Sequence, residues 1–332
     1  MITHRERLQA CLAGETTDRI PVALWRHFPV DDQSPERLAE AILHWQRQYE
    51  FDFVKVTPAS SFCVKDWGVD DVWEGHPEGT RRYVKRAIFS PQDWISLPEL
   101  DPTAPHLAEQ LACLRYLRVH LGPDTPIIQT IFSPLSQAKN LAGPETLLTH
   151  LRLSPEALLK GLETIARTTQ RFVEAALQTG IDGIFYAIQH AQAGLLSLAE
   201  YQTFGLPFDR QVIEPAQEAW LNVLHIHGSA IYFSIVSSFP FPVINWHDRE
   251  TAPSLAQAQA DPAFWLNGAP RVVCGGLRQD TLVFKTPEQV DAEAQDAIQQ
   301  TGGKRFILST GCVVPIIAPH GNLQTARKAG MD

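Results

Sequence analysis

The stretch PEALLKGLETIARTTQRFVEAALQTGIDGIFYAI, residues 155–188, carries the pattern that decides the fold. Its first part, Pro155–Gln178, is amphipathic and follows Ser154, so a cap residue precedes a proline at the first helical position. Its last part, Gly183–Ile188, is an uninterrupted apolar run, which is typical of a parallel strand covered on both faces. The stretch therefore predicts a helix followed by a buried parallel strand.

The same alternation recurs along the chain. Further apolar runs predict the strands Ile20–Trp25, Phe51–Thr57, Pro126–Ile131, Leu221–Ile226, Pro242–Asn245, Arg271–Gly275 and Phe306–Ser309. Helical patterns lie between them at Ser34–Tyr49, His106–Gly122, Pro144–His150 and Pro287–Thr301. Eight strands alternating with helices predict an α/β fold of the TIM (β/α)8 barrel type. A doubly wound sheet is the competing arrangement, but its usual glycine-rich turn is missing, because the first strand runs into Arg26-His27-Phe28-Pro29.

One gap between the predicted strands is long. Residues 59–106 separate the second strand from the third and contain Trp67, Trp73 and several basic residues and prolines. We expect a hairpin or lid inserted into one barrel domain that spans residues 1–332. No repeat, low-complexity segment or Gly/Ser linker argues for a second domain.

Composition narrows the class of protein. The chain has 332 residues, a formal net charge of −9 and no basic stripe with interleaved aromatic residues, so a nucleic-acid partner is not expected. No apolar run approaches the roughly 18 residues that suggest a membrane span. The polar start lacks a secretory pattern, and the five scattered cysteines form no CxxC pair. These features predict a soluble, cytoplasmic enzyme with reduced thiols and a small-molecule substrate.

In a barrel, side chains at the carboxyl ends of the strands converge on one mouth. The polar residues at or near those positions are Arg26, His27, Lys55, Gln129, Tyr186, Gln189, His225, His227, Asn245, His247 and Cys312. Arg26 matches the geometry of a carboxylate or phosphate, and His27 is suited to proton transfer near neutral pH. These two are predicted as catalytic residues, and Lys55 is predicted to hold an anionic part of the substrate with Arg26. Gln129, Tyr186, Gln189, Asn245 and His247 are predicted to line the substrate pocket.

His225-Ile226-His227 is the most specific of these patterns. Two histidines at i and i+2 of a strand point to the same face, and Cys312 follows the eighth predicted strand. Two histidines and a cysteine with an open fourth position are a catalytic zinc ligand set. The alternatives are a core histidine and an inert buried cysteine. Metal-dependent amidohydrolases carry such a pair on their first strand, whereas here it lies on the fifth.

Several segments, in order and spacing, resemble the uroporphyrinogen decarboxylase superfamily, which includes zinc-dependent, corrinoid-linked methyltransferases. They are Arg5–Leu8, Asp18–Val22, Phe132–Leu135 with Leu141–Gly143, Ser154–Glu156 through Gly180–Gly183, and Gly311–Pro315 with Asn322-Leu323. The resemblance covers nearly the whole chain and implies a TIM barrel.

The resemblance also separates two branches of the superfamily. Decarboxylases are implied to use a second first-loop arginine, an aspartate, a tyrosine and a closing histidine. At these positions stand Val30, Ala59, a residue near Lys139, and Cys312. The methyltransferases are implied to bind zinc through His-x-Cys and a closing Cys; His225 and Cys312 match, and His227 replaces the first Cys.

The methyltransferase branch implies zinc, a methyl donor in the form of a corrinoid on a partner protein, and a thiol acceptor. One alternative is a metal-free decarboxylase or lyase that acts on a porphyrin-like or aromatic acid through Arg26, His27 and Lys55. The other is a corrinoid- or tetrapyrrole-binding protein without catalysis.

Overall fold

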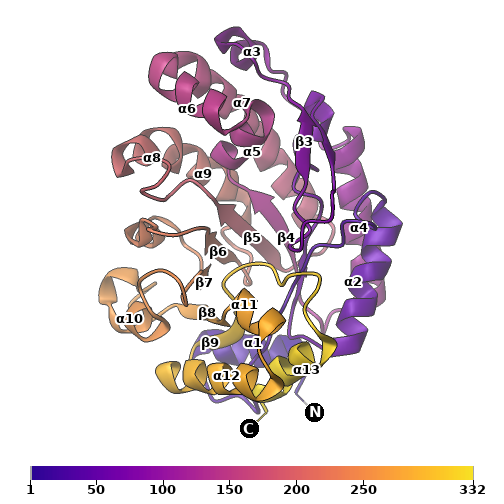
Figure 1. The fold of residues 1–332 in the computed structure, drawn as a ribbon, viewed down its shortest axis with the longest axis vertical. Coiled ribbons are helices and arrows are strands. Elements are labelled where there is room, and N and C mark those ends of the chain that lie inside the picture. Colours follow the sequence, from indigo (N-terminus) through magenta and orange to yellow (C-terminus); the bar gives the residue numbers. More distant parts are fainter. Residues whose placement is uncertain (1, 332) are drawn as a thin grey trace.

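The computed structural model describes residues 2–331. Seven parallel strands form one curled sheet in the order β1-β4-β5-β6-β7-β8-β9, and the helices surround its outer face (Figure 1). The strands are β1 (Val54–Val56), β4 (Ile127–Phe132), β5 (Gly183–Ile188), β6 (Val223–Ile226), β7 (Val243–Trp246), β8 (Val272–Leu277) and β9 (Phe306–Thr310). The predicted α/β class and the parallel pairing are confirmed.

Pro155 and Pro287 each begin a helix, as predicted. The helices are α1 (His4–Ala13), α2 (Pro35–Tyr49), α4 (Pro105–Leu121), α5 (Pro134–Ala142), α6 (Pro144–Leu153), α7 (Pro155–Leu177), α8 (Leu198–Phe204), α9 (Leu206–Ile213), α10 (Leu255–Ala260), α11 (Gln279–Phe284), α12 (Pro287–Thr301) and α13 (His320–Ala329). None of the helices in residues 2–331 is long and apolar enough to cross a membrane.

The predicted first strand, Ile20–Trp25, is not formed, which corrects the expected count of eight. Val22 makes one isolated parallel bridge to Leu308 of β9. The Ala23 N–H donates to the Leu308 carbonyl (3.0 Å), and the Val22 carbonyl accepts from the Asp52 N–H (2.8 Å). Pro21 has no N–H to donate, which shortens any ladder here. An extended segment thus lies between β9 and the chain leading into β1.

The long gap after β1 contains the expected hairpin. Strands β2 (Asp70–Val72) and β3 (Arg82–Lys85) pair antiparallel, and the short helix α3 (Pro91–Ser96) follows. The hairpin is tied to the loops beside it: Arg81 pairs with the Asp32 carboxylate (2.5 Å), and the Pro77 carbonyl accepts from the Ile316 N–H (2.7 Å).

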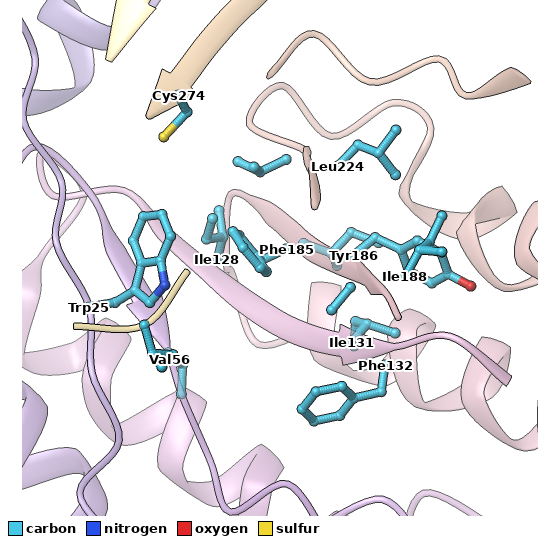
Figure 2. Packing of buried hydrophobic residues seen from close by; sticks show 14 of the residues in the cluster. Trp25, Val56, Ile128, Ile131, Phe132, Phe185, Tyr186, Ile188, Leu224 and Cys274 are labelled. Atoms are coloured by element: carbon cyan, nitrogen blue, oxygen red, sulfur yellow. The ribbon is translucent and has the colours of Figure 1, made fainter. Parts of the chain in front are cut away.

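Successive side chains of each buried strand point alternately to the inside of the curled sheet and to its outside. Phe185 of β5 packs edge-on against Trp25 with ring centroids 5.2 Å apart, inside the curl of the sheet. Its neighbour Tyr186 is directed away from Trp25, toward Phe239 and Phe241 (Figure 2). Both residues are buried, so the apolar run in the sequence does not reveal which of them faces the interior.

Candidate active site

Four potential metal ligands meet where β6, β7 and β9 end. His225 and His227 come from β6 and the residue after it, His247 follows β7, and Cys312 follows β9. One ligand atom from each lies within 4.8 Å of the others. The His227 Nδ1 is 3.7 Å from the Cys312 Sγ and 3.3 Å from the His247 Nε2. The structure therefore brings the predicted triplet together and adds His247, which the sequence suggested only as a pocket residue.

Asn245 of β7 fixes the orientation of His225. Its Nδ2 donates to the carbonyls of Cys274 (2.7 Å) and Thr310 (3.0 Å), so its Oδ1 is the acceptor left for the His225 Nδ1–H (2.6 Å). This bond leaves the His225 Nε2 with a free lone pair, which is the state of a metal ligand. Burial also lowers the pKa of His225 well below its ordinary value, with further lowering by His227 and His247. Asn245 thus supports the cluster from behind rather than lining the pocket as predicted.

The chemistry of the four donors fits zinc. Three imidazoles and one thiol are nitrogen and sulfur ligands of the kind that zinc takes in tetrahedral sites. Burial lowers the pKa of His227 as well, which favours the neutral imidazole that binds metals.

A cavity of about 260 Å³ opens beside the cluster. Its walls combine aromatic rings with a few polar groups, as ligand sites do. The lining residues that bear on the chemistry are Trp25, His27, Lys55, Glu78, Lys139, Phe185, Gln189, His225, His227 and Cys312. Gln189, His27 and Lys55 are therefore placed at the cavity as the sequence predicted.

Lys55 lies in an aromatic corner of this cavity. Its Nζ is 4.4 Å from the ring centroid of Phe185 and 5.5 Å from that of Trp25, and it donates to the Thr57 hydroxyl (3.3 Å). Burial lowers the pKa of Lys55 to about 7, and the negative charge of a Cys312 thiolate opposes that lowering. The amine is therefore close enough to Cys312 to respond to charge at the cluster.

His27 is also buried, but its electrostatics differ from the prediction. Burial lowers its pKa to about 3, with additional lowering by the charges of Lys55 and Arg81. The ring is therefore neutral at physiological pH, and exchange of a proton near neutrality is not what this environment favours.

Three predicted residues are turned away from the cavity. The Gln129 Oε1 accepts from the Nε2 of Gln110 on α4 (2.8 Å), because Gln129 lies on the outward-facing positions of β4. For the same reason the Tyr186 hydroxyl donates to Asp209 of α9 (2.7 Å). Arg26 stacks over the Trp45 ring (4.9 Å) and donates to the Ile316 carbonyl (3.2 Å). The pocket-lining positions predicted for Gln129 and Tyr186, and the catalytic position predicted for Arg26, are therefore not the positions that these side chains occupy.

Other lining residues were not predicted. Lys139 comes from α5, and Glu78 comes from the hairpin, where its Oε1 accepts from the Gln279 Nε2 (3.0 Å). The sequence candidates were the polar residues at the carboxyl ends of predicted strands. Lys139 and Glu78 do not lie at such positions, so they were not among those candidates. Phe185 could have been found from the alternation of β5 once Tyr186 was placed outside.

The family model described as Uroporphyrinogen decarboxylase (URO-D) matches residues 3–330. The chain belongs to the uroporphyrinogen decarboxylase family. This finding confirms the resemblance seen in the sequence, and the family includes both decarboxylases and methyltransferases.

Within the uroporphyrinogen decarboxylase family, two kinds of relative differ in coverage. The chain is 20% identical to the methylcobamide:CoM methyltransferase MtbA of Methanosarcina mazei, over 97% of this chain and 96% of that protein. It is 22% identical to MtbA of Methanosarcina acetivorans with the same coverage. The uroporphyrinogen decarboxylase of Rhodococcus opacus is 31% identical, but over only 44% of this chain and 42% of that one.

Solved structures show the same fold. A methyltransferase from Methanosarcina mazei superposes with a TM-score of 0.84 at 19% identity, covering 99% of this chain and 98% of that one. A B12-independent methionine synthase from Shewanella sp. W3-18-1 superposes with a TM-score of 0.61 at 14% identity, covering 94% and 92%.

Proposed function

We propose that this protein is a zinc-dependent methyltransferase that moves a methyl group from a corrinoid on a partner protein to a small thiol. The observation that carries the proposal is the meeting of His225, His227, His247 and Cys312 beside a cavity. Similarity to methyltransferases over nearly the whole chain supports it, whereas the similarity to the Rhodococcus decarboxylase covers less than half.

His225, His227 and Cys312 would hold the zinc ion and leave its fourth position to the acceptor, with His247 close beside them. Bound there, zinc supplies a Lewis acid that lowers the pKa of an acceptor thiol, and the thiolate is the nucleophile. His225, His227 and Cys312 face the cavity, so an acceptor in the cavity lies against them. Asn245 keeps His225 in the ligating tautomer.

The other residues of the chain would bind and orient the acceptor. Trp25 and Phe185 exclude water from one wall, and the Lys55 amine favours negative charge near Cys312. The acceptor thiol would release its proton to solvent, and its sulfur would bond to the methyl carbon while the bond between that carbon and the corrinoid metal breaks and leaves its electron pair on the corrinoid. Gln189 offers an amide to the acceptor from the end of β5.

We also propose that the insertion at residues 59–106 covers the site, and that residues 20–25 take the place of the eighth strand in a (β/α)8 barrel. The hairpin supplies Glu78 and Thr80 to the cavity wall, which supports its role as a lid. Backbone bonds from the segment to Leu308 and Asp52 support the closure of the barrel.

Metal analysis tests the proposed function. Protein purified without chelator is expected to contain one zinc per chain, and His225→Ala and Cys312→Ala are expected to lose it. Cys113→Ala is the matched control, because Cys113 is fully buried on α4 and belongs to no ligand cluster. Wild-type protein without stoichiometric zinc would overturn the proposal.

Activity assays separate the proposal from its alternatives. We expect methyl transfer from methylcobalamin to a thiol by the wild type and its loss in Cys312→Ala. Turnover of uroporphyrinogen without zinc would favour a decarboxylase instead. Tight corrinoid binding with no transfer to any thiol would indicate a binding protein.

A further inference from the structure

A second cavity, of about 100 Å³, lies between the amino ends of α2 and α4. It is lined by the loop before α2, the loop after β1 and the first two turns of α4, and none of its described lining residues belongs to the cavity beside the His/Cys cluster. Leu38 and Phe62 form apolar parts of its wall, and Asp32 and Gln110 form polar parts. None of these four residues has a part in the proposed methyl transfer, so the second cavity stands apart from that function.

Asp32 is the buried charged group of this cavity. Its side chain is 1% exposed, and its Oδ1 accepts from Arg81 (2.5 Å) and from the Gln33 Nε2 (2.7 Å). Its Oδ2 is also buried and has no hydrogen-bond partner within residues 2–331. A buried carboxylate oxygen without a donor is costly in free energy, so the Asp32 Oδ2 is suited to accept from a ligand.

The charges around Asp32 do not balance. Arg81 also donates to Asp71 (3.1 Å), whose side chain is fully buried and whose Oδ2 likewise has no partner among the described residues. One guanidinium therefore serves two carboxylates, and the buried group has one negative charge in excess. Burial raises the pKa of Asp32, the bonds from Gln33 and Arg81 lower it, and the charge of Asp71 raises it again.

The positive groups nearby are already engaged. The Lys65 amine lines the cavity and donates to the Gln33 Oε1 (3.2 Å). Asp66 satisfies the amino end of α4 by accepting from the N–H groups of His106 and Leu107 (3.1 and 3.2 Å), and the residue before α2 caps that helix with its side chain. No positive group of the cavity wall is therefore left to serve the free oxygen of the buried carboxylate.

We infer that this cavity binds a small ammonium ion, free or as the head of a short primary amine, with the Asp32 Oδ2 as its counter-charge. The Gln110 Oε1 is a second acceptor, because the Gln110 Nε2 donates to Gln129 (2.8 Å) and no donor reaches the Oε1 within residues 2–331. Leu38 and Phe62 offer apolar contact to the carbon atoms of an amine. The volume suits a ligand of a few non-hydrogen atoms.

An N–H cation fits these groups better than a divalent metal does. Calcium and magnesium take about six to eight oxygen ligands, commonly with more than one carboxylate among them. In the part of the chain that the structure describes, only the cluster at the ends of β6, β7 and β9 brings three or more His, Cys, Asp or Glu ligand atoms together. Each N–H of an ammonium group needs a single acceptor, which matches one carboxylate oxygen and one amide oxygen.

An ammonium ion in this cavity would act on the hairpin through Arg81. Arg81 pairs with Asp32 and donates to the Pro29 carbonyl (2.6 Å). Glu78 and Thr80 lie just before it in the chain and line the substrate cavity. A cation at the Asp32 Oδ2 offsets the excess negative charge and leaves the bond between the Oδ1 and Arg81 in place. Occupation of the second cavity therefore stabilises the wall of the first.

NMR titration tests the binding of small cations directly. Ethylammonium chloride would be compared with ethanol, which has no charge, and with tetramethylammonium, which has the charge but no N–H. At constant ionic strength we expect a dissociation constant for ethylammonium on the order of 1–10 mM, and binding of the other two at least about tenfold weaker. Ammonium chloride distinguishes the two sources: it binds as well as ethylammonium if the ligand is the free ion, and less well if the ligand is a primary amine.

Variants then assign the binding to Asp32. Asp32→Asn is expected to weaken binding of ethylammonium about tenfold or more, since it removes the counter-charge. Asp31→Asn is the matched control, because Asp31 is the adjacent carboxylate and pairs with Arg37 at the surface. Lys65→Gln is expected to tighten binding about threefold, because it removes a like charge from the cavity wall. Melting temperatures show which variants are folded, and Lys65→Gln tests the site even if Asp32→Asn does not fold.

Hydrogen exchange tests the link to the hairpin. Backbone amides of β2 and β3 are expected to exchange more slowly in wild-type protein saturated with ethylammonium than in the same concentration of tetramethylammonium. Asp31→Asn should show the same slowing, and folded Asp32→Asn should show none.

Several results would overturn the inference. Equal binding of ethanol would show that a neutral donor such as water is enough for Asp32. No binding of either ammonium ion, an undiminished affinity in folded Asp32→Asn, or unchanged or weaker binding by Lys65→Gln would also contradict it. Unchanged exchange of the hairpin in the ethylammonium-bound protein would overturn its link to the cavity. Zinc content and methyl transfer enter none of these measurements, so the proposed function is tested separately.

Discussion

Asn245 shows how one side chain prepares another for metal binding. Its two N–H donations go to backbone carbonyls of β8 and β9, so its amide has one orientation. His225 can then present only its Nδ1–H to Asn245, and the opposite nitrogen is left unprotonated. From the sequence, Asn245 could be identified only as a polar residue at the end of a strand, and its bond to His225 could not be predicted.

Substitution of Asn245 by alanine should weaken zinc binding while leaving all four donors in place. Loss of a residue that orients a ligand typically costs about 10–100-fold in metal affinity. Competition with a chromophoric chelator would measure this change.

Asn222→Ala is the control for Asn245→Ala, because Asn222 is equally buried and its Nδ2 also donates to two backbone carbonyls, away from the cluster. Both variants should lose stability, and only Asn245→Ala should lose zinc affinity. An equal change in zinc affinity would show that general destabilisation, not ligand orientation, is responsible.

At the scale of elements, the β2–β3 hairpin contributes Glu78 and Thr80 to the wall of the cavity. Its tip packs directly on His27, and Gly79 makes that approach possible. Gly79 has a φ of +77°, and a Cβ at this position would lie 2.5 Å from the Cβ of His27. The hairpin and the loop after residue 25 are therefore fitted to each other at a single glycine.

Gly79→Ala is expected to lift the hairpin tip and weaken binding of the acceptor or its methylated product about tenfold, because the cavity loses part of its wall. Gly75→Ala is a matched control: its φ is +86°, and nothing lies within 4 Å of the added Cβ. Both variants pay a backbone cost of about 1–2 kcal/mol, measured by urea unfolding. If Gly75→Ala weakened binding as much, contact with His27 would not be the cause.

At the scale of the whole molecule, a buried carboxylate ties the N-terminal part of the chain to the sheet just before β1, at the end opposite the site. Asp52 is fully buried just before β1 and accepts from His4 (3.0 Å), Arg7 (2.8 Å), Arg19 (2.7 and 2.8 Å) and the Val22 N–H (2.7 Å). It therefore joins α1, the segment 20–25 and the start of β1.

Asp52→Asn should lower the free energy of unfolding by about 3–5 kcal/mol near neutral pH, because Arg7 and Arg19 keep their buried positions without this charge. Burial alone would raise the pKa of Asp52, but bonds from His4, Arg19 and Val22 lower it from 3.8 to about 2. The folded-state pKa is thus depressed, and the stabilisation is present above pH 3.8 and lost as the pH falls toward 2.

Urea unfolding of the wild type and of Asp52→Asn from neutral to acidic pH measures how much stability the Asp52 charge contributes. The two unfolding free energies should converge as the pH falls below 4, while zinc content at neutral pH stays equal. Glu74→Gln, which removes an exposed ion pair with Arg82, should have no measurable effect on stability. A constant difference at every pH would contradict the role of the Asp52 charge.

The sequence by itself determined the elements and the centre of the site. Pro287–Thr301 and Gly183–Ile188 have the same bounds in the structure as in the prediction, because caps, prolines and apolar runs act over a few neighbouring residues. The spacing of His225 and His227 placed two imidazoles on one face for the same local reason.

Only the tertiary structure decided which other side chains reach that face. Gln129 and Tyr186 point outward because the register of the sheet, not composition, sets which alternate residue faces the interior. His247, Asn245 and Lys139 join the site through contacts between elements far apart in the chain. Those contacts depend on the closing of the curled sheet, which no local pattern in the sequence encodes.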